Sequence, residues 1–225
     1  MSGDAAAHVV EDFFGVVRLL SDGSVVRGDQ SVLIPAETVP VADVPGVQWK
    51  DVVYDAARGL KVRVYRPPAA ATAGEGGAEL PAVVLSVQYR LAPEHRLPAA
   101  IDDGVTFLSW LGQQAGLGEN SEPWLAESAD FSRTFVSGVS AGANLAHHVV
   151  VRAASGQIEL GPVRVVGYVL FSAFFGGVER VATETDPPAG VSLAVEMSDQ
   201  LWRMALPVGA TRGPPVGQPV RPGQP

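Results

Sequence analysis

FVSGVSAGANLAHH, residues 135–148, is the stretch of sequence that decides the fold. An apolar, β-branched run leads into Gly-x-Ser-x-Gly, and a run of good helix formers follows. This order predicts a strand, a sharp turn that lifts Ser140 above the edge of a sheet, and a helix. Gly138 and Gly142 fit the turn, because we expect a side chain at either position to collide where strand and helix are forced together. The same letters also suit an ordinary strand-to-helix turn, since glycine and serine are common in turns.

The composition of the 225-residue chain describes a globular protein of one α/β domain or slightly more. Its 47% hydrophobic and 18% charged residues argue against a disordered chain. The net charge of −8 argues against a nucleic-acid partner and against attraction to anionic membranes. Without cysteine, the chain has no disulfide, thiolate nucleophile or cysteine metal site. No apolar run approaches the ~20 residues that span a bilayer, and the acidic N-terminus lacks a basic signal region, so we expect a cytoplasmic protein.

Periodicity places further elements on both sides of the turn. Alternating patterns predict an antiparallel pair over residues 47–66, and 25–27 suit a short return strand after the turn at 21–23. Continuous apolar runs predict strands at 81–87 and 163–171 that are buried on both faces. Helical spacing predicts helices from Pro98 to the 112–118 region, over 141–154 and over 192–206. Strands that alternate with helices predict a parallel sheet with right-handed crossovers.

A second motif, SVQYRLAPEHRLPAA, occupies residues 86–100. With the Gly-x-Ser-x-Gly turn and the following NLAH, it resembles the hormone-sensitive-lipase-like carboxylesterases, more narrowly the plant branch that also contains the gibberellin receptors. Shorter matches are VEDF at 10–13, DGS at 22–24, YRP at 65–67 and FFGG at 174–177. The resemblance runs from about residue 8 to about residue 209 with one gap. It implies an α/β-hydrolase fold, with a mostly parallel sheet and helices on both faces, incomplete in this chain.

The resemblance also implies an activity, which is hydrolysis of a carboxylic ester through an acyl-enzyme. It makes Ser140 the nucleophile and the N–H of Ala141 an oxyanion donor, with Gly138 and Gly142 forming the elbow. A small-molecule ester is the implied partner, and no cofactor is implied. The charged residues form no metal-ligand pattern, and no feature of the sequence sets an oligomeric state.

Three departures from the family pattern affect this expectation. The HGGG motif, expected between Pro68 and Leu80, is absent, and the Gly-Glu-Gly-Gly of residues 74–77 has no strand before it. The histidines after Ser140 are His147 and His148, which a helix carries ~10–12 Å away from the serine. From about Val208 the chain becomes rich in proline and glycine where the family supplies acid and base. We therefore expect a truncated chain that is weakly active or inactive.

The expected organisation has three parts. Residues 1–46 form an N-terminal lid or extension, 47–206 a partial hydrolase domain with a linker-like 67–80, and 207–225 a disordered tail. A non-catalytic, hormone-receptor-like ligand-binding protein is the alternative function.

Other polar residues have structural interpretations. His147 and His148 are expected to be a buried helix residue and its solvent-exposed neighbour. Asp102 and Asp103 near Arg90 and Arg96 are interpreted as helix-dipole complement and surface pairing. His95 is expected to be structural.

Overall fold

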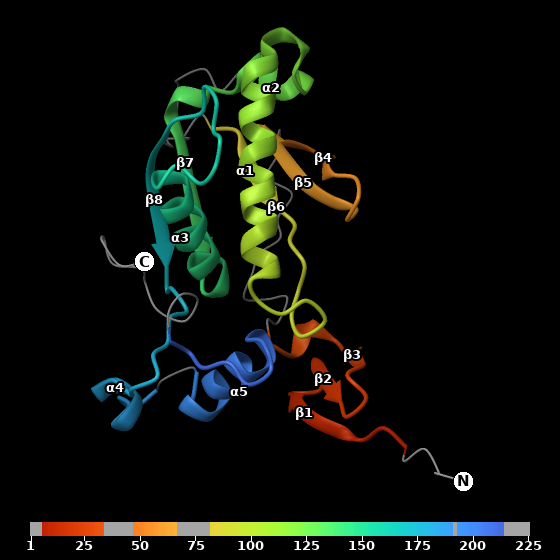
Figure 1. Cartoon of the computed structure of the whole chain (residues 1–225), viewed down its shortest axis with the longest axis vertical. Coiled ribbons are helices and arrows are strands. Elements are labelled where there is room, and N and C mark those ends of the chain that lie inside the picture. The colour runs from red at the N-terminus through yellow and green to blue at the C-terminus, as the bar shows by residue number, and fades with distance from the viewer. Residues whose placement is uncertain (1–5, 34–46, 67–81, 191–192, 214–225) are drawn as a thin grey trace. The chain divides into compact units, whose positions relative to one another are not determined.

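The computed structural model describes residues 6–33, 47–66, 82–190 and 193–213. Contacts divide the chain into two compact units. The larger unit comprises Asp43–Tyr89, Ala100–Phe175 and Pro219–Pro225, and the smaller one Met1–Ala42, Arg90–Ala99 and Gly176–Gln218. Figure 1 labels the elements of both units. The linker-like segment 67–80 and most of the proline-rich tail lie outside the described residues.

An antiparallel sheet of the larger unit confirms the pair expected over residues 47–66. It has the order β4 (Gln48–Asp55), β5 (Leu60–Arg66) and β6 (Val84–Val87). Leu60, Val62 and Val64 alternate along β5 and are buried, which is the period-two pattern of a strand with one face on the core. The turn between β4 and β5 ends at Gly59, whose φ of +68° favours glycine.

A second sheet carries the Gly-x-Ser-x-Gly turn. β7 (Thr134–Val139) pairs in parallel with β8 (Val165–Phe171), and α3 (Ala141–Ala154) connects them (Figure 1). α3 begins and ends at the predicted residues. A parallel pair requires a crossover of this kind, because its strands enter from the same end of the sheet.

α1 (Ala99–Leu117) packs between these two sheets of the larger unit (Figure 1). Phe107 meets Tyr54 of β4 edge to face, with ring centroids 5.5 Å apart. Two glycines of α1 lie where the backbone or a side chain approaches closely. A Cβ at Gly104 would lie 2.7 Å from Val149 of α3, and one at Gly112 would lie 2.8 Å from the carbonyl oxygen of Leu160. The short α2 (Pro123–Ser128) follows and was not predicted.

Burial of the predicted strands differs from the expectation. The strands at 81–87 and 163–171 are present as β6 and β8, but they are not buried on both faces, since Val84 is 55% exposed and Phe171 54%. On β7, Phe135 is 65% exposed. Among the described residues β6 pairs with β5 alone and β7 with β8 alone, so the sheet exists in two pieces. Of the described strand pairs, β7 with β8 is the parallel one.

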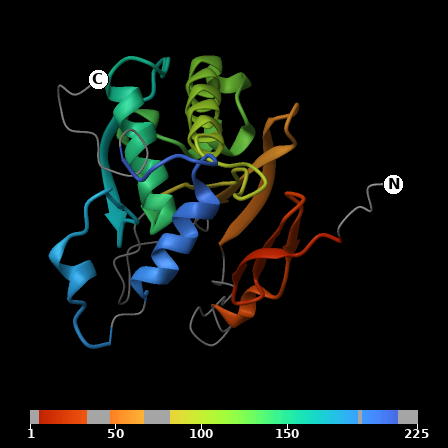
Figure 2. The same cartoon turned by 60° about the horizontal axis from the view of Figure 1, so that its bottom comes forward.

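The smaller unit contains a three-stranded antiparallel sheet and two helices (Figure 2). The strands are β1 (Val9–Phe13), β2 (Val17–Leu20) and β3 (Val25–Arg27), and the helices are α4 (Ala182–Thr185) and α5 (Val195–Ala205). β1 and α5 are joined by an ion pair in which Arg203 Nε lies 2.6 Å from Glu11 Oε1. The predicted return strand is confirmed as β3, and the predicted helix at 192–206 as α5.

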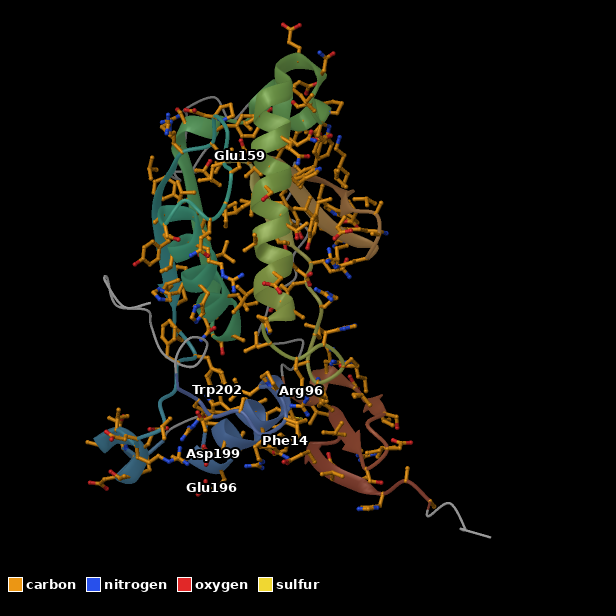
Figure 3. All side chains as sticks on the ribbon, in the orientation of Figure 1. Phe14, Arg96, Glu159, Glu196, Asp199 and Trp202 are labelled. Carbon is orange, nitrogen blue, oxygen red and sulfur yellow. The ribbon has the colours of Figure 1, made fainter. Side chains whose placement is uncertain are left out.

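Arginines tie other segments of this unit to α5. Arg96 Nη1 donates to the carbonyl oxygens of Arg203, Met204 and Leu206, at 2.5, 2.8 and 2.6 Å, and so satisfies carbonyls that the end of the helix leaves free (Figure 3). At the start of the proline-rich tail, Arg212 Nη1 lies 3.0 Å from Asp199 Oδ1 of α5.

Candidate active site

Ser140 occupies the turn between β7 and α3 in a conformation that serine rarely adopts. Its φ is +53° and its ψ is −118°. Backbone strain of this kind persists only where the surroundings hold it, and it is concentrated at functional sites. Here the Ser140 N–H donates to Phe171 O of β8 at 2.9 Å. The Ser140 carbonyl accepts from the N–H groups of Ala143, Asn144 and Phe174 at 3.1, 3.2 and 3.0 Å. The strained residue is thus bonded at both backbone groups.

Gly138 and Gly142 differ in whether a side chain would fit at their positions. A Cβ at Gly138 would lie 2.2 Å from the carbonyl oxygen of Gly142 and 2.7 Å from the Ala143 nitrogen, both backbone atoms. The predicted collision is therefore confirmed at Gly138. It is wrong at Gly142, where a Cβ would meet no described atom within 4 Å. Gly142 lies on the outer side of the first turn of α3, so its missing side chain relieves no contact with the strand.

The N-terminus of α3 presents donors beside the serine. Within the described residues, the N–H groups of Ala141 and Gly142 donate to no acceptor, as expected at the start of a helix. Ser140 and Ala141 are both exposed, and the Ser140 hydroxyl has no partner in the described parts of the chain. This arrangement suits an exposed hydroxyl that attacks a carbonyl whose oxygen becomes negative next to the helix N-terminus.

The structure keeps both neighbouring histidines away from the serine. His147 and His148 lie two turns along α3, and the rise of a helix places them ~10–12 Å from Ser140. The expectation that His148 faces solvent is wrong, because both residues are buried. The rings of His147 and His148 meet edge to face at 5.4 Å, and His147 meets Phe175 in the same way at 5.4 Å. Burial lowers the pKa of His147, which favours a neutral, structural imidazole.

The acidic residues considered from sequence have other partners. Asp102 pairs with Arg152 of α3 at 2.9 Å, so the expected pairing of Asp102 with Arg90 or Arg96 is wrong. Asp103 is fully buried and so is not a surface residue. The difference arises because α1 turns this part of its face toward α3, which supplies the arginine.

In the smaller unit, Asp199 accepts a hydrogen bond from Arg180 and also forms an ion pair with Arg212. Glu184 pairs with the same two arginines. These paired arginines lower the pKa of the Asp199 carboxyl, and a backbone hydrogen bond from Val181 is the main cause that lowers the pKa of Glu184. Both carboxylates are therefore stabilised in their charged form by ion pairs and hydrogen bonds within the smaller unit.

Asn144 lies in the first turn of α3, next to the candidate site, and makes a contact that the sequence did not reveal. Its side-chain Nδ2 donates to the carbonyl oxygen of Phe174 at 3.1 Å, and only 3% of the residue is exposed. The segment that contains Phe174 follows β8 through Ser172, which has a positive φ of 44°. The signal in the sequence was its place in the NLAH motif that follows the turn, which indicates no partner for its side chain.

One depression on the described surface lies away from Ser140. A depression of about 490 Å³ lies on the β4–β6 sheet and is lined by polar and charged side chains, among them Asp51, Arg63 and Gln88, without Ser140. No three histidine, aspartate or glutamate side chains of the described residues are placed to hold a metal ion. None of the described helices is both long and apolar enough to cross a membrane.

A family model for the alpha/beta hydrolase fold matches residues 69–224, which is most of the chain. The chain belongs to the alpha/beta-hydrolase fold family. Among curated relatives, a 3-O-acetylpapaveroxine carboxylesterase of Papaver somniferum is 46% identical over 135 residues, covering 59% of this chain and 41% of the poppy protein. A chloroplastic tuliposide A-converting enzyme of Tulipa gesneriana is 32% identical over 247 residues, covering 97% of this chain and 60% of the tulip protein.

Solved structures agree with this family. A bacterial heroin esterase is similar in fold, with a TM-score of 0.63 and 22% identity over 83% of this chain and 62% of the esterase. The chain spans about two fifths to three fifths of the length of the poppy and tulip relatives. The resemblance to plant carboxylesterases and the expected fold class are thereby confirmed.

Proposed function

We propose that this chain is a serine carboxylic-ester hydrolase in which Ser140 is the nucleophile and the Ala141 N–H stabilises the oxyanion. The observation that carries the proposal is the strained Ser140, with a φ of +53°, between a parallel strand and a helix N-terminus with free donors. The carboxylesterase relatives support the reaction class.

The reaction follows from this geometry in two steps. The Ser140 oxygen attacks the ester carbonyl, its proton leaves to a base, and the carbonyl oxygen becomes an anion next to the Ala141 N–H. When this tetrahedral intermediate collapses, the bond between the carbonyl carbon and the alcohol oxygen breaks. The alcohol leaves with a proton from the base, and an acyl-serine remains. Water then attacks the acyl-serine in the same way, which releases the carboxylic acid and restores the hydroxyl. No cofactor enters either step.

The base is the part of this mechanism that the chain supplies poorly. No histidine follows His148 in the sequence, and His147 and His148 are buried in α3, the helix that follows Ser140. The HGGG motif that contributes a second oxyanion donor is also missing from the sequence. Loss of triad members costs ~10⁴–10⁶ in kcat. We therefore propose that this chain by itself acylates slowly and turns over weakly or not at all.

The proposed substrate is a small-molecule ester, and the proposed location is the cytoplasm. The name of the poppy relative specifies an acetyl ester, and the strongly acidic net charge of −8 disfavours nucleic acid as a partner. The tulip relative is described as chloroplastic, so a fluorescent fusion that enters chloroplasts would contradict the proposed location. The ligand-binding alternative is not proposed, because the relatives are esterases.

Reaction with paraoxon tests the nucleophile, and p-nitrophenyl acetate tests turnover. Paraoxon phosphorylates activated serines, so intact-mass spectrometry is expected to show one slow adduct that Ser140→Ala abolishes. Turnover of p-nitrophenyl acetate is expected to be negligible. Equal labelling of the Ser140→Ala variant would refute the assigned nucleophile. A rapid burst followed by turnover, both lost in Ser140→Ala, would instead refute the proposed weakness of this chain.

A further inference from the structure

The first turn of α3 is bonded to a segment thirty residues further along the chain. Asn144 donates from its side-chain Nδ2 to the Phe174 carbonyl oxygen at 3.1 Å. The Phe174 N–H donates in turn to the carbonyl oxygen of Ser140 at 3.0 Å. Residue 174 is therefore bonded through both its backbone groups, with one bond to the serine and one to the asparagine. We call these two hydrogen bonds the 140–174 clamp.

The clamp acts on the peptide unit that contains the proposed oxyanion donor. Because a trans peptide is planar, its C=O and N–H point in opposite directions, and fixing one fixes the other. The C=O of Ser140 and the N–H of Ala141 belong to the same peptide. Donors from Ala143, Asn144 and Phe174 hold that carbonyl. The bond from Phe174 comes from outside the helix, so it fixes this plane relative to β8 as well as to α3.

Asn144 is the side chain that holds Phe174 in place. It is only 3% exposed, and an asparagine amide supplies the donor that the Phe174 carbonyl requires. The segment it holds leaves β8 through Ser172, at a φ of +44°, a conformation that surrounding contacts must maintain. Loss of the Asn144 donor removes this hydrogen bond to the Phe174 carbonyl and so loosens the position of the Phe174 N–H against Ser140.

We propose that Asn144 is a positioning residue for ester hydrolysis, which aims the Ala141 N–H at the oxyanion through the 140–174 clamp. This inference rests on the function proposed above. Asn144 touches no reacting atom, so it acts through Phe174 and the Ser140–Ala141 peptide. A purely structural role would instead lower stability without changing the direction of the Ala141 N–H.

The test compares Asn144→Asp and Asn144→Ala with Val149→Ala. Val149 lies on the same helix, is 5% exposed and packs against α1, so its truncation weakens the packing of α3 without touching the clamp. Asn144→Asp keeps the shape and, as a carboxylate, lacks the donor, and Asn144→Ala removes the donor where a buried carboxyl stays protonated or prevents folding. The first measurement is hydrogen exchange of the Phe174 amide and the chemical shift of the Ala141 amide by NMR. The second is the rate of phosphorylation by paraoxon, whose phosphoryl oxygen takes the place of the oxyanion.

The Asn144 variants are expected to exchange the Phe174 amide at least ~10-fold faster than Val149→Ala, shift the Ala141 amide, and react with paraoxon about 10–100-fold more slowly. Val149→Ala is expected to keep the wild-type rate of phosphorylation within ~2-fold. Phosphorylation of the Asn144 variants at the Val149→Ala rate would overturn the inference while leaving Ser140 as the nucleophile. A wild type that paraoxon leaves unmodified at Ser140 would overturn the proposed function and this inference with it.

Discussion

Gly138→Ala is expected to disrupt the turn, whereas Gly142→Ala, four residues later in the same motif, is expected to be harmless. At Gly138 the added Cβ would lie 2.2 Å from the Gly142 oxygen, 2.3 Å from the Gly142 carbon and 2.7 Å from the Ala143 nitrogen. All three atoms belong to the backbone, so no side chain can rotate out of the way. β7 and α3 would have to separate by about 1 Å to reach ordinary contact distance.

The size of the effect follows from this geometry. Overpacking a well-packed site costs about 1–3 kcal/mol, and a collision with three backbone atoms belongs at the upper end of that range. For a chain of this length, about 3 kcal/mol corresponds to a fall in Tm of roughly 6–12 °C. At Gly142 the new methyl group meets no described atom within 4 Å, and alanine favours a helix by up to ~1 kcal/mol over glycine.

Thermal unfolding followed by circular dichroism, together with urea titration, measures both variants against the wild type. We expect Gly138→Ala to unfold at a clearly lower temperature, and Gly142→Ala at the wild-type temperature or slightly above. The reasoning is refuted if Gly138→Ala loses less than about 1 kcal/mol, or if Gly142→Ala loses as much as Gly138→Ala.

Two further contrasts follow from the same structure. In α1, Gly112→Ala is expected to lower the free energy of unfolding by about 1–3 kcal/mol, because its Cβ would lie 2.8 Å from the Leu160 carbonyl oxygen. Gly116→Ala, whose Cβ meets no described atom within 4 Å, is expected to raise that free energy by up to ~1 kcal/mol. Urea titration measures both variants, and equal changes would contradict the packing described. The Arg203 hydrogen bond holds the pKa of Glu11 below its ordinary value, so the carboxylate stabilises the fold above that value and this stabilisation is lost as the pH falls through the lower, folded-state pKa. The stability lead of the wild type over Glu11→Gln is therefore expected to shrink below about pH 4.5 in urea titrations, and a lead that persists unchanged at about pH 3 would disprove the pairing.

The elements that depend on neighbouring residues were predictable from sequence. α3 begins and ends at the predicted residues, and α1 begins directly after Pro98, because apolar spacing and a proline at the start of a helix are local signals. The short α2 was missed, although Glu122 caps it by accepting hydrogen bonds from the N–H groups of Trp124 and Leu125. Six residues are too few for a helical period to emerge.

Burial was less predictable than secondary structure. An apolar run such as 163–171 shows that both faces of a strand can be buried. Whether they are buried depends on which strands and helices from elsewhere in the chain pack against them. In the described residues β7 and β8 pair only with each other, so Phe135 and Phe171 are more than half exposed.

Within the candidate site, Ser140 and Ala141 followed from the motif, while the part of Asn144 depended on a partner thirty residues away. No periodicity in either segment signals that pairing. The mistaken interpretation of Gly142 has the same origin. A motif identifies which positions are glycine, whereas only the packing shows that Gly138 faces the helix backbone and Gly142 faces open space.

The 140–174 clamp also bears on when the turn at Ser140 can fold during synthesis of the protein. The hydrogen bonds described for Ser140 and the Asn144 side chain all join residues between 140 and 174. Their partners are therefore close in sequence, and closing such short loops is fast compared with the ~5–20 residues that a ribosome adds each second. The elbow can assume its strained shape on the ribosome once β8 and Phe174 have emerged, before α5 is synthesised. A reactive-site turn would then take its final form while the last part of this chain is still being made.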